Sequence, residues 1–93
     1  GGPPPEPPTN LQHAIAGRTV TLSWDAPTMG APPTSYRLEA GNAPGLANLA
    51  TATTAGLAFV VASVPGGTYY VRVRAVNATG PSAPTPDAVI VVP

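Results

Sequence analysis

The stretch Gly67–Gly80, GTYYVRVRAVNATG, decides how the rest of the chain is interpreted. Between Tyr69 and Val76 the side chains alternate, with one series apolar throughout and the other carrying two arginines. A two-residue period places successive side chains on opposite faces of an extended strand. The pattern therefore predicts a strand with one core-facing side and one solvent-facing side, ended by a turn at Asn77–Gly80.

Shorter runs of the same kind recur along the chain between turn signals rich in proline and glycine. Short strands with one buried face pair into two antiparallel sheets that pack face to face. The sequence therefore predicts an all-β sandwich of seven strands in about 85 residues, without helices. The seven runs lie at 11–16, 18–24, 35–40, 46–52, 57–64, 69–76 and 87–92, and the run at 46–52 is the weakest.

The inward positions of these runs predict the core. Leu11, His13 and Ile15 share the apolar face of the first strand, and Leu57 and Val61 are expected to point inward from the fifth. Small domains depend on a few large buried side chains, because they bury a smaller share of their surface than large ones. The residues expected to form the structural core are Trp24, Tyr36, Phe59, Tyr69, Val71 and Val73.

Composition limits the classes of function. The chain has 93 residues, no cysteine, and four arginines balanced by four acids, so it is one domain without a disulfide or a thiolate metal site. A nucleic-acid partner is not expected, since phosphate contacts need an excess of cations. No apolar run reaches the ~20 residues of a membrane span. The abundance of alanine, glycine and proline, without lysine, favours a bacterial source.

Five of the fourteen prolines fall in GGPPPEPP, residues 1–8. Proline fixes φ and lacks an N–H donor, so this segment is expected to be an extended polyproline II linker with no partner in a sheet. A ligand for a proline-binding module is the alternative. The predicted boundaries are therefore a proline-rich linker at 1–8 and a single domain at 9–93.

Several short motifs, taken in order, resemble the fibronectin type III domain over residues 8–92. The resemblance implies an immunoglobulin-like Greek-key sandwich in which a three-stranded sheet faces a four-stranded one and Trp24 lies in the middle of the core. It also implies that Tyr69, not Tyr70, bonds to the backbone of the preceding turn as a tyrosine corner. The motifs are Pro8, Asn10 and Leu11; VTLSW at 20–24; Pro32 or Pro33 before Tyr36; Val64-Pro65-Gly66; Tyr69 to Asn77; and Gly80, Ser82 and Pro84.

No residues for catalysis, a cofactor or a metal are evident, and an enzyme is not expected. His13 is the only histidine, and a metal site needs further ligands of its kind. The four carboxylates are interpreted as solvated charges that are too scattered for acid–base work; they are Glu6, Asp25, Glu39 and Asp87. Asn77-Ala78-Thr79 is formally a glycosylation acceptor and is interpreted as a turn.

One surface is a candidate for contacts. Family topology places the third and sixth strands side by side, so their outer faces align. That face is either a solvated surface with cross-strand pairs or a contact patch for a neighbouring domain, a polysaccharide or a surface protein. The loops 25–34 and 77–85 are a second candidate. The residues of the face are Arg37, Glu39, Tyr70, Arg72 and Arg74.

The resemblance also sets the expected function. The family is known for cell adhesion through an Arg-Gly-Asp loop, but this loop reads NATGPS, residues 77–82, so integrin binding does not carry over. The alanine-rich, lysine-free style is similar to family members that act as spacers or accessory modules in bacterial secreted enzymes and envelope proteins. We therefore expect a monomeric, non-catalytic spacer of a secreted or cell-surface protein, with a binding module as the alternative.

Overall fold

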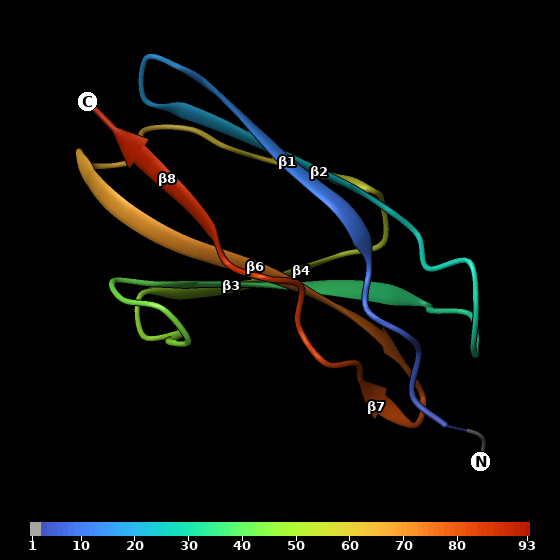
Figure 1. The fold of residues 1–93 in the computed structure, drawn as a ribbon. Coiled ribbons are helices and arrows are strands. Elements are labelled where there is room, and N and C mark those ends of the chain that lie inside the picture. The colour runs from blue at the N-terminus through green and yellow to red at the C-terminus, as the bar shows by residue number, and fades with distance from the viewer. Residues whose placement is uncertain (1–2) are drawn as a thin grey trace.

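The computed structural model describes residues 3–93 and contains only strands and loops over that range (Figure 1). The strands form two antiparallel sheets, which confirms the predicted all-β sandwich. One sheet has the order β1-β2-β5 and the other β4-β3-β6, with β7 and β8 both pairing with β6. The strands are β1 (Thr9–Ala16), β2 (Thr19–Asp25), β3 (Ser35–Gly41), β4 (Ala50–Thr54), β5 (Ala58–Val61), β6 (Gly67–Asn77), β7 (Gly80–Pro81) and β8 (Ala88–Val92).

The described strands number eight instead of seven, because the last edge of the larger sheet is interrupted. β7 pairs with the end of β6 at Val76 and Asn77, and β8 pairs with its beginning from Gly67 to Val71. Between these two pieces the chain carries Pro84 and Pro86, which have no N–H to donate to a ladder. The two pieces together occupy the place of a single edge strand, so the larger sheet has four rows, as the resemblance implies.

Two hydroxyl groups keep β6 bonded across this interruption. The backbone N–H of Val73 donates to Thr85 Oγ1 at 3.0 Å, and that of Ala75 donates to Ser82 Oγ at 2.9 Å. In return, the N–H groups of Thr85 and Ser82 donate to the carbonyls of Val73 and Ala75. Both hydroxyl residues are buried, so they satisfy donors that would otherwise be costly in the core.

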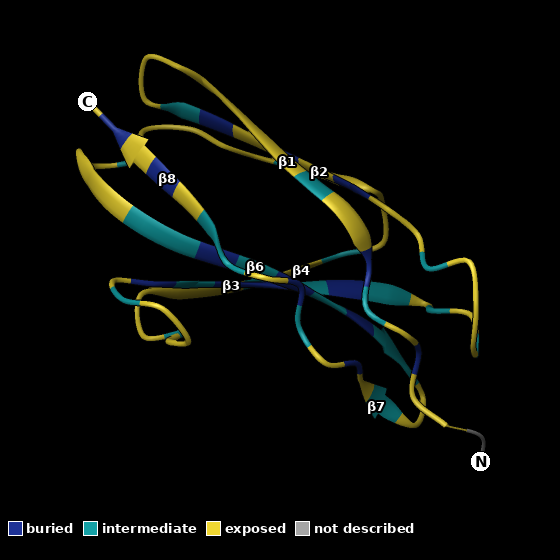
Figure 2. Ribbon diagram, in the orientation of Figure 1, coloured by how far each residue is buried: buried dark blue, intermediate teal, exposed yellow. Residues whose placement is uncertain are grey.

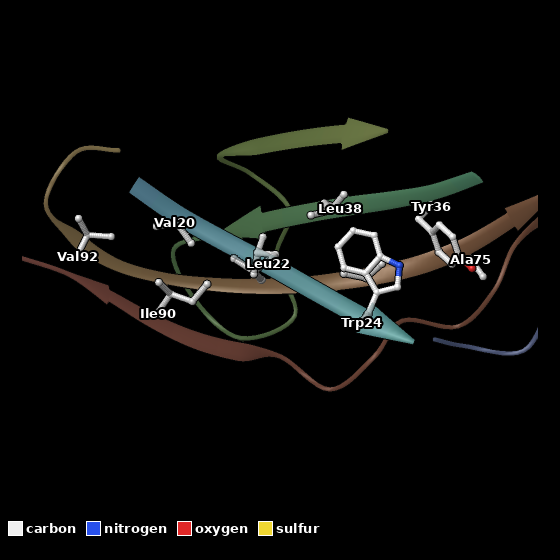
Figure 3. Packing of buried hydrophobic residues seen from close by; sticks show 10 residues of the cluster. Val20, Leu22, Trp24, Tyr36, Leu38, Ala75, Ile90 and Val92 are labelled. Atoms are coloured by element: carbon white, nitrogen blue, oxygen red, sulfur yellow. The ribbon is translucent and has the colours of Figure 1, made fainter. Parts of the chain in front are cut away.

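The core lies between the sheets and follows the predicted alternation (Figures 2 and 3). Trp24 and Tyr36 pack edge to face, with ring centroids 5.6 Å apart and planes at 60°. The indole N–H of Trp24 finds no hydrogen-bond acceptor among the described residues. The buried cluster consists of Val20, Leu22, Trp24, Tyr36, Leu38, Val71, Val73, Ala75, Ile90 and Val92.

Four residues that were expected on inner faces are more exposed than a core residue. His13 and Ile15 lie opposite Leu22 and Val20, so they point to the inner side, but β1 is an edge strand and leaves both exposed. Val61 also lies opposite Val20, on the other edge strand, and is 37% exposed. Leu57 precedes β5 and is 47% exposed. The alternation is thus correct, but the two edges of the small sheet are incompletely covered.

The described part of the N-terminal segment packs on the domain, although it joins neither sheet. Pro5 is buried and forms an isolated antiparallel bridge with Gly30. Asn77 Nδ2 donates to the Pro3 carbonyl at 3.3 Å. A proline still has a carbonyl to offer, so lacking an N–H does not prevent a bridge. Gly1 and Gly2 of the predicted linker lie outside the described residues.

Over residues 3–93 the molecule is elongated, and the two ends of this range lie far apart. Its principal extents are 43, 21 and 17 Å. The N-terminal segment runs off at one end of the sandwich, beside β7, and the chain leaves at the other end after β8 (Figure 1). The described chain therefore enters and leaves the sandwich at opposite ends of its strands.

Candidate functional site

The pairing of β3 with β6 brings the five residues of the candidate face together. Arg37 lies opposite Arg74, Glu39 opposite Arg72, and Gly41 opposite Tyr70. Leu38 alternates with Glu39 and is buried in the core, so the charged residues occupy the outer face of the larger sheet. We call Arg37, Glu39, Arg72 and Arg74 the arginine–glutamate cluster.

Glu39 is the centre of this cluster. Its Oε1 accepts hydrogen bonds from Arg72 Nε at 2.6 Å and from Arg74 Nε at 3.0 Å, and its Oε2 lies 3.7 Å from Arg37 Nη1. Glu39 is only 7% exposed. The expectation that it is a solvated charge is therefore wrong, because its carboxylate is in contact with three guanidinium groups.

Residues 42–48 form a loop that folds back over the outer face of the larger sheet (Figure 1). Arg72 Nη1 donates to the Gly45 carbonyl at 3.1 Å, and the Gly45 N–H donates to Asp87 Oδ2 at 3.0 Å. Gly41 lies against the backbone of Leu46, where a Cβ atom would collide. A glycine at this position allows the loop to approach the sheet closely. We call this segment the 42–48 loop.

The arginines of the cluster lower the pKa of Glu39. Burial raises the pKa of its carboxyl group, but hydrogen bonds from Arg74 and Arg72, together with their positive charges, outweigh burial and leave the pKa below its ordinary value of 4.5. The carboxylate is thus held ionised, and it neutralises one of three cations. The cluster retains an excess of two positive charges at neutral pH.

The members of the cluster differ in what they offer to a ligand. The side chains of Arg72 and Arg74 are 15% and 22% exposed and are engaged by Glu39, Gly45 and Ser82. The side chain of Arg37 is 39% exposed and has the longest contact of the three. Its guanidinium is the most accessible of the three for an added anion.

The loops that were the second candidate lie where the N-terminal segment packs. In loop 25–34, Gly30 pairs with Pro5, and Met29 is 76% exposed. In loop 77–85, Asn77 Oδ1 accepts from the N–H groups of Thr79 and Gly80, which is the geometry of a turn. These loops are built from backbone contacts and small side chains.

The structure buries four residues of the expected core and half-buries the other two. Trp24, Tyr36, Val71 and Val73 are at most 6% exposed, while Phe59 and Tyr69 are partly buried against them. The Tyr69 hydroxyl donates to the Pro65 carbonyl at 2.6 Å, in the corner before β6. A half-buried phenol thereby has a partner for its polar end.

One feature escaped the sequence reasoning, namely a cavity of about 420 Å³ between the sheets. It lies between β3 and β4 on one side and β2 and β5 on the other. The available signal was the series of small inward residues Ala40, Ala50 and Ala52, which are too short to reach the opposite sheet. The remaining lining is mostly apolar and includes Leu49, Phe59, Val61, Val64 and Ile90.

The sequence model of the fibronectin type III domain matches residues 6–90. The chain belongs to the fibronectin type III family. Domains of this family are in general non-catalytic modules of larger proteins. Over residues 3–93, no group of three or more His, Cys, Asp or Glu side chains is placed to hold a metal ion, and no helix is long and apolar enough to cross a membrane.

Solved structures of fibronectin type III domains superimpose well on this one. The twitchin kinase region from C. elegans is 30% identical, with a TM-score of 0.82 over 98% of this chain. The sixth fibronectin type III domain of human fibronectin type III domain containing protein 3 is 25% identical, with a TM-score of 0.78 over the whole chain and 90% of its own. The chicken CNTN1 FN1–FN3 domains are 18% identical, with a TM-score of 0.81 over 96% of this chain.

This fibronectin type III chain spans 32% of the CNTN1 chain and 17% of the twitchin chain. In these two proteins a domain of this family therefore makes up only part of a longer chain. A comparison with curated protein sequences found no significant match. The structures described above come from animals, and the bacterial source stays a prediction.

Proposed function

We propose that this fibronectin type III domain is a non-catalytic spacer that sets the distance and direction between neighbouring domains of a larger, secreted or cell-surface bacterial protein. The observation that carries the proposal is the elongated shape, 43 Å in its longest dimension, with the described ends at opposite ends of it (Figure 1). Domains attached at the two ends would be held apart by the length of the sandwich.

The packed N-terminal segment supports orientation as well as distance. Pro3 and Pro5 are tied to Asn77 and Gly30, so the entry direction is fixed relative to the sandwich. Proline-rich segments are semi-rigid even when free. We propose that residues 1–8 act as a linker whose last part is held against the domain. The direction of a preceding domain relative to the sandwich would then be fixed.

A distance measurement tests this role. The chain lacks cysteine, so Thr9→Cys and Pro93→Cys, or Pro3→Cys and Pro93→Cys, give unique labelling sites for single-molecule energy transfer. A spacer gives one narrow population for both pairs, with the longer distance for the pair that includes position 3. A matched Asn77→Ala variant should broaden only the pair that includes position 3. A broad distribution for that pair in the unmodified domain would refute a fixed entry direction.

A second candidate is a binding module that uses the Arg37/Tyr70/Arg72/Arg74 face, and the excess of two positive charges in the arginine–glutamate cluster favours it. A polysaccharide or a surface protein with an acidic group is the partner that this charge fits. Arg37 and Tyr70 are the residues to change, because Arg72 and Arg74 hold Glu39 and their loss would disturb the fold. The loops 25–34 and 77–85 carry no comparable charge.

Retention on an insoluble glucuronoxylan, whose uronic acids are anionic, tests this second candidate, with the uncharged polymers chitin and cellulose beside it. The unmodified domain should be retained on the acidic polymer, and an Arg37→Ala/Tyr70→Ala variant should be released. Arg18→Ala is the matched control, because Arg18 is an exposed arginine in the turn between β1 and β2. No retention of the unmodified domain would remove these polymers as ligands and favour the spacer.

A further inference from the structure

On one side of the sandwich, which we call the open side, the edge strands of both sheets lack the features that usually hinder pairing with an added strand. At the other side, β1 packs beside β8. At the open side, β4 ends the larger sheet and β5 ends the smaller one, and both border the cavity of about 420 Å³. Free strand edges present unpaired N–H and C=O groups, which are a template for another strand.

The remaining edges of the described sheets carry the protections that natural proteins use. β1 has a bulge between Thr9 and Gln12, with Asn10 at a φ of 56°. The β7/β8 edge is interrupted by prolines, of which Pro84 and Pro86 lie between the two strands. Bulges and prolines both hinder the pairing of an added strand. β4 has neither of them, and its sequence is Ala-Thr-Ala-Thr-Thr.

The inner side of this edge carries no charge either, because the charged residues opposite β4, Arg37 and Glu39, lie opposite Thr53 and Thr51 on the outer side. All eight charged residues of the chain lie outside residues 40–71, a span that includes β4 and β5 in full. Large apolar side chains are exposed along it, with Leu49 at 47%, Val60 at 60% and Val61 at 37%. Glu39 contributes to the cavity lining, but its carboxylate is bonded to Arg72 and Arg74 on the outer face. An occupant that matches this side is therefore uncharged and apolar.

We propose that the edge of β4 binds an extended, uncharged peptide strand from a partner protein, with alternate apolar side chains of that strand entering the cavity. A strand added to β4 continues the pleat of the larger sheet, so its inward side chains lie next to Ala50 and Ala52. Those two alanines line the cavity. The backbone edge gives the peptide hydrogen bonds, and the cavity selects its inward side chains. This site is independent of the spacer role and uses neither end of the molecule.

A fluorescent peptide tests the site. The probe is a fluorescein-labelled strand of alternating threonine and valine, with one lysine at each end for solubility, and fluorescence anisotropy measures its affinity for the 93-residue chain. The comparison probe replaces each valine with glutamate. The first peptide should bind at least tenfold more tightly, because only its inward side chains suit an apolar cavity. Equal binding of the two peptides would overturn the proposal.

Two variants of β4 locate the binding face. Ala52→Leu fills the cavity from the inner face and should weaken peptide binding at least tenfold. Thr53→Leu is the matched control on the outer face of the same strand and should leave the affinity within about twofold. Trp24 fluorescence reports whether each variant is folded. If Ala52→Leu is unfolded, the wild-type comparison of the two peptides still decides the proposal.

Amide NMR shifts identify the edge that the peptide uses. Shifts that cluster in Ala50–Thr54 support addition to β4, and shifts confined to Ala58–Val61 overturn it. Light scattering and an apolar dye cover the other occupants. A concentration-dependent dimer without peptide binding would assign the edge to a second copy of the chain, and binding of the dye alone would make the cavity a small-molecule site. Either result overturns the peptide proposal.

Discussion

Replacing Glu39 with glutamine removes the charge at the centre of the arginine–glutamate cluster and keeps the size of the side chain. Hydrogen bonds to charged groups contribute about 1.5–3 kcal/mol, against about 0.5–1.5 kcal/mol for neutral ones. Glu39 accepts two such bonds, from Arg72 and Arg74, so the substitution should lower the free energy of unfolding by about 2–3 kcal/mol. The more exposed pair with Arg37 adds less than about 0.5 kcal/mol.

Urea titration followed by Trp24 fluorescence measures this loss, because Trp24 is the only tryptophan and is buried. The loss should depend on pH. The pKa of Glu39 is lower in the folded domain than its ordinary value of 4.5, so the unfolded chain binds the proton more readily. The stabilisation is complete above pH 4.5 and disappears as pH falls through the folded pKa. Wild type and Glu39→Gln should therefore converge in stability at low pH.

A double-mutant cycle with Arg72→Gln separates this interaction from general disruption. If Glu39 acts through its ion pairs, the double variant should be clearly more stable than the sum of the single losses predicts. Equal stability of wild type and Glu39→Gln at pH 7 would refute the reasoning. A stability difference that stays constant from pH 7 to pH 3 would also refute it, because that result would show a loss of packing instead of charge.

Substitutions at three other residues test the core and its hydrogen bonds by urea titration with circular dichroism. Trp24→Ala should cost about 3–5 kcal/mol, and a cost below 1 kcal/mol would show that Trp24 does not support the core. Tyr69→Phe should cost about 1 kcal/mol through the lost bond to the Pro65 carbonyl, and an unchanged midpoint would contradict this. Thr85→Val should cost about 1–3 kcal/mol by leaving the Val73 N–H without an acceptor, whereas Thr85→Ser should be tolerated.

The sequence predicted the architecture well because alternation is a local signal. The strands β2 and β6 each bury alternate residues, as in Val20, Leu22 and Trp24. These strands lie inside the sandwich, where a buried face requires apolar side chains. At the edges the same rule overestimated burial, as at Ile15 and Leu57. Alternation indicates which way a side chain points, but only the opposite sheet determines whether it is covered.

The sequence predicted which residues of the candidate site share one face, but not the hydrogen bonds and ion pairs between them. The register of β3 and β6 brings the five residues together, and the resemblance to a known topology was enough to expect that. Glu39 is bonded to Arg72 and Arg74, and Arg72 is in turn bonded to Gly45 of the 42–48 loop, which itself bonds to Asp87. Such long-range contacts leave no periodic pattern in the sequence, so a carboxylate on an outer face was interpreted as solvated.

Charge is unevenly distributed between the outer face of the larger sheet and its edge strand β4. Half of the eight charged residues form the arginine–glutamate cluster, while residues 40–71 have no charge at all. A strand edge without charge is normally a hazard for solubility, and the small alanines of β4 add a cavity to it. A chain that only needed to be a spacer would gain stability from a larger residue at Ala52 that fills the cavity. The small residue at this position fits the proposed partner strand, whose inward side chains need that space.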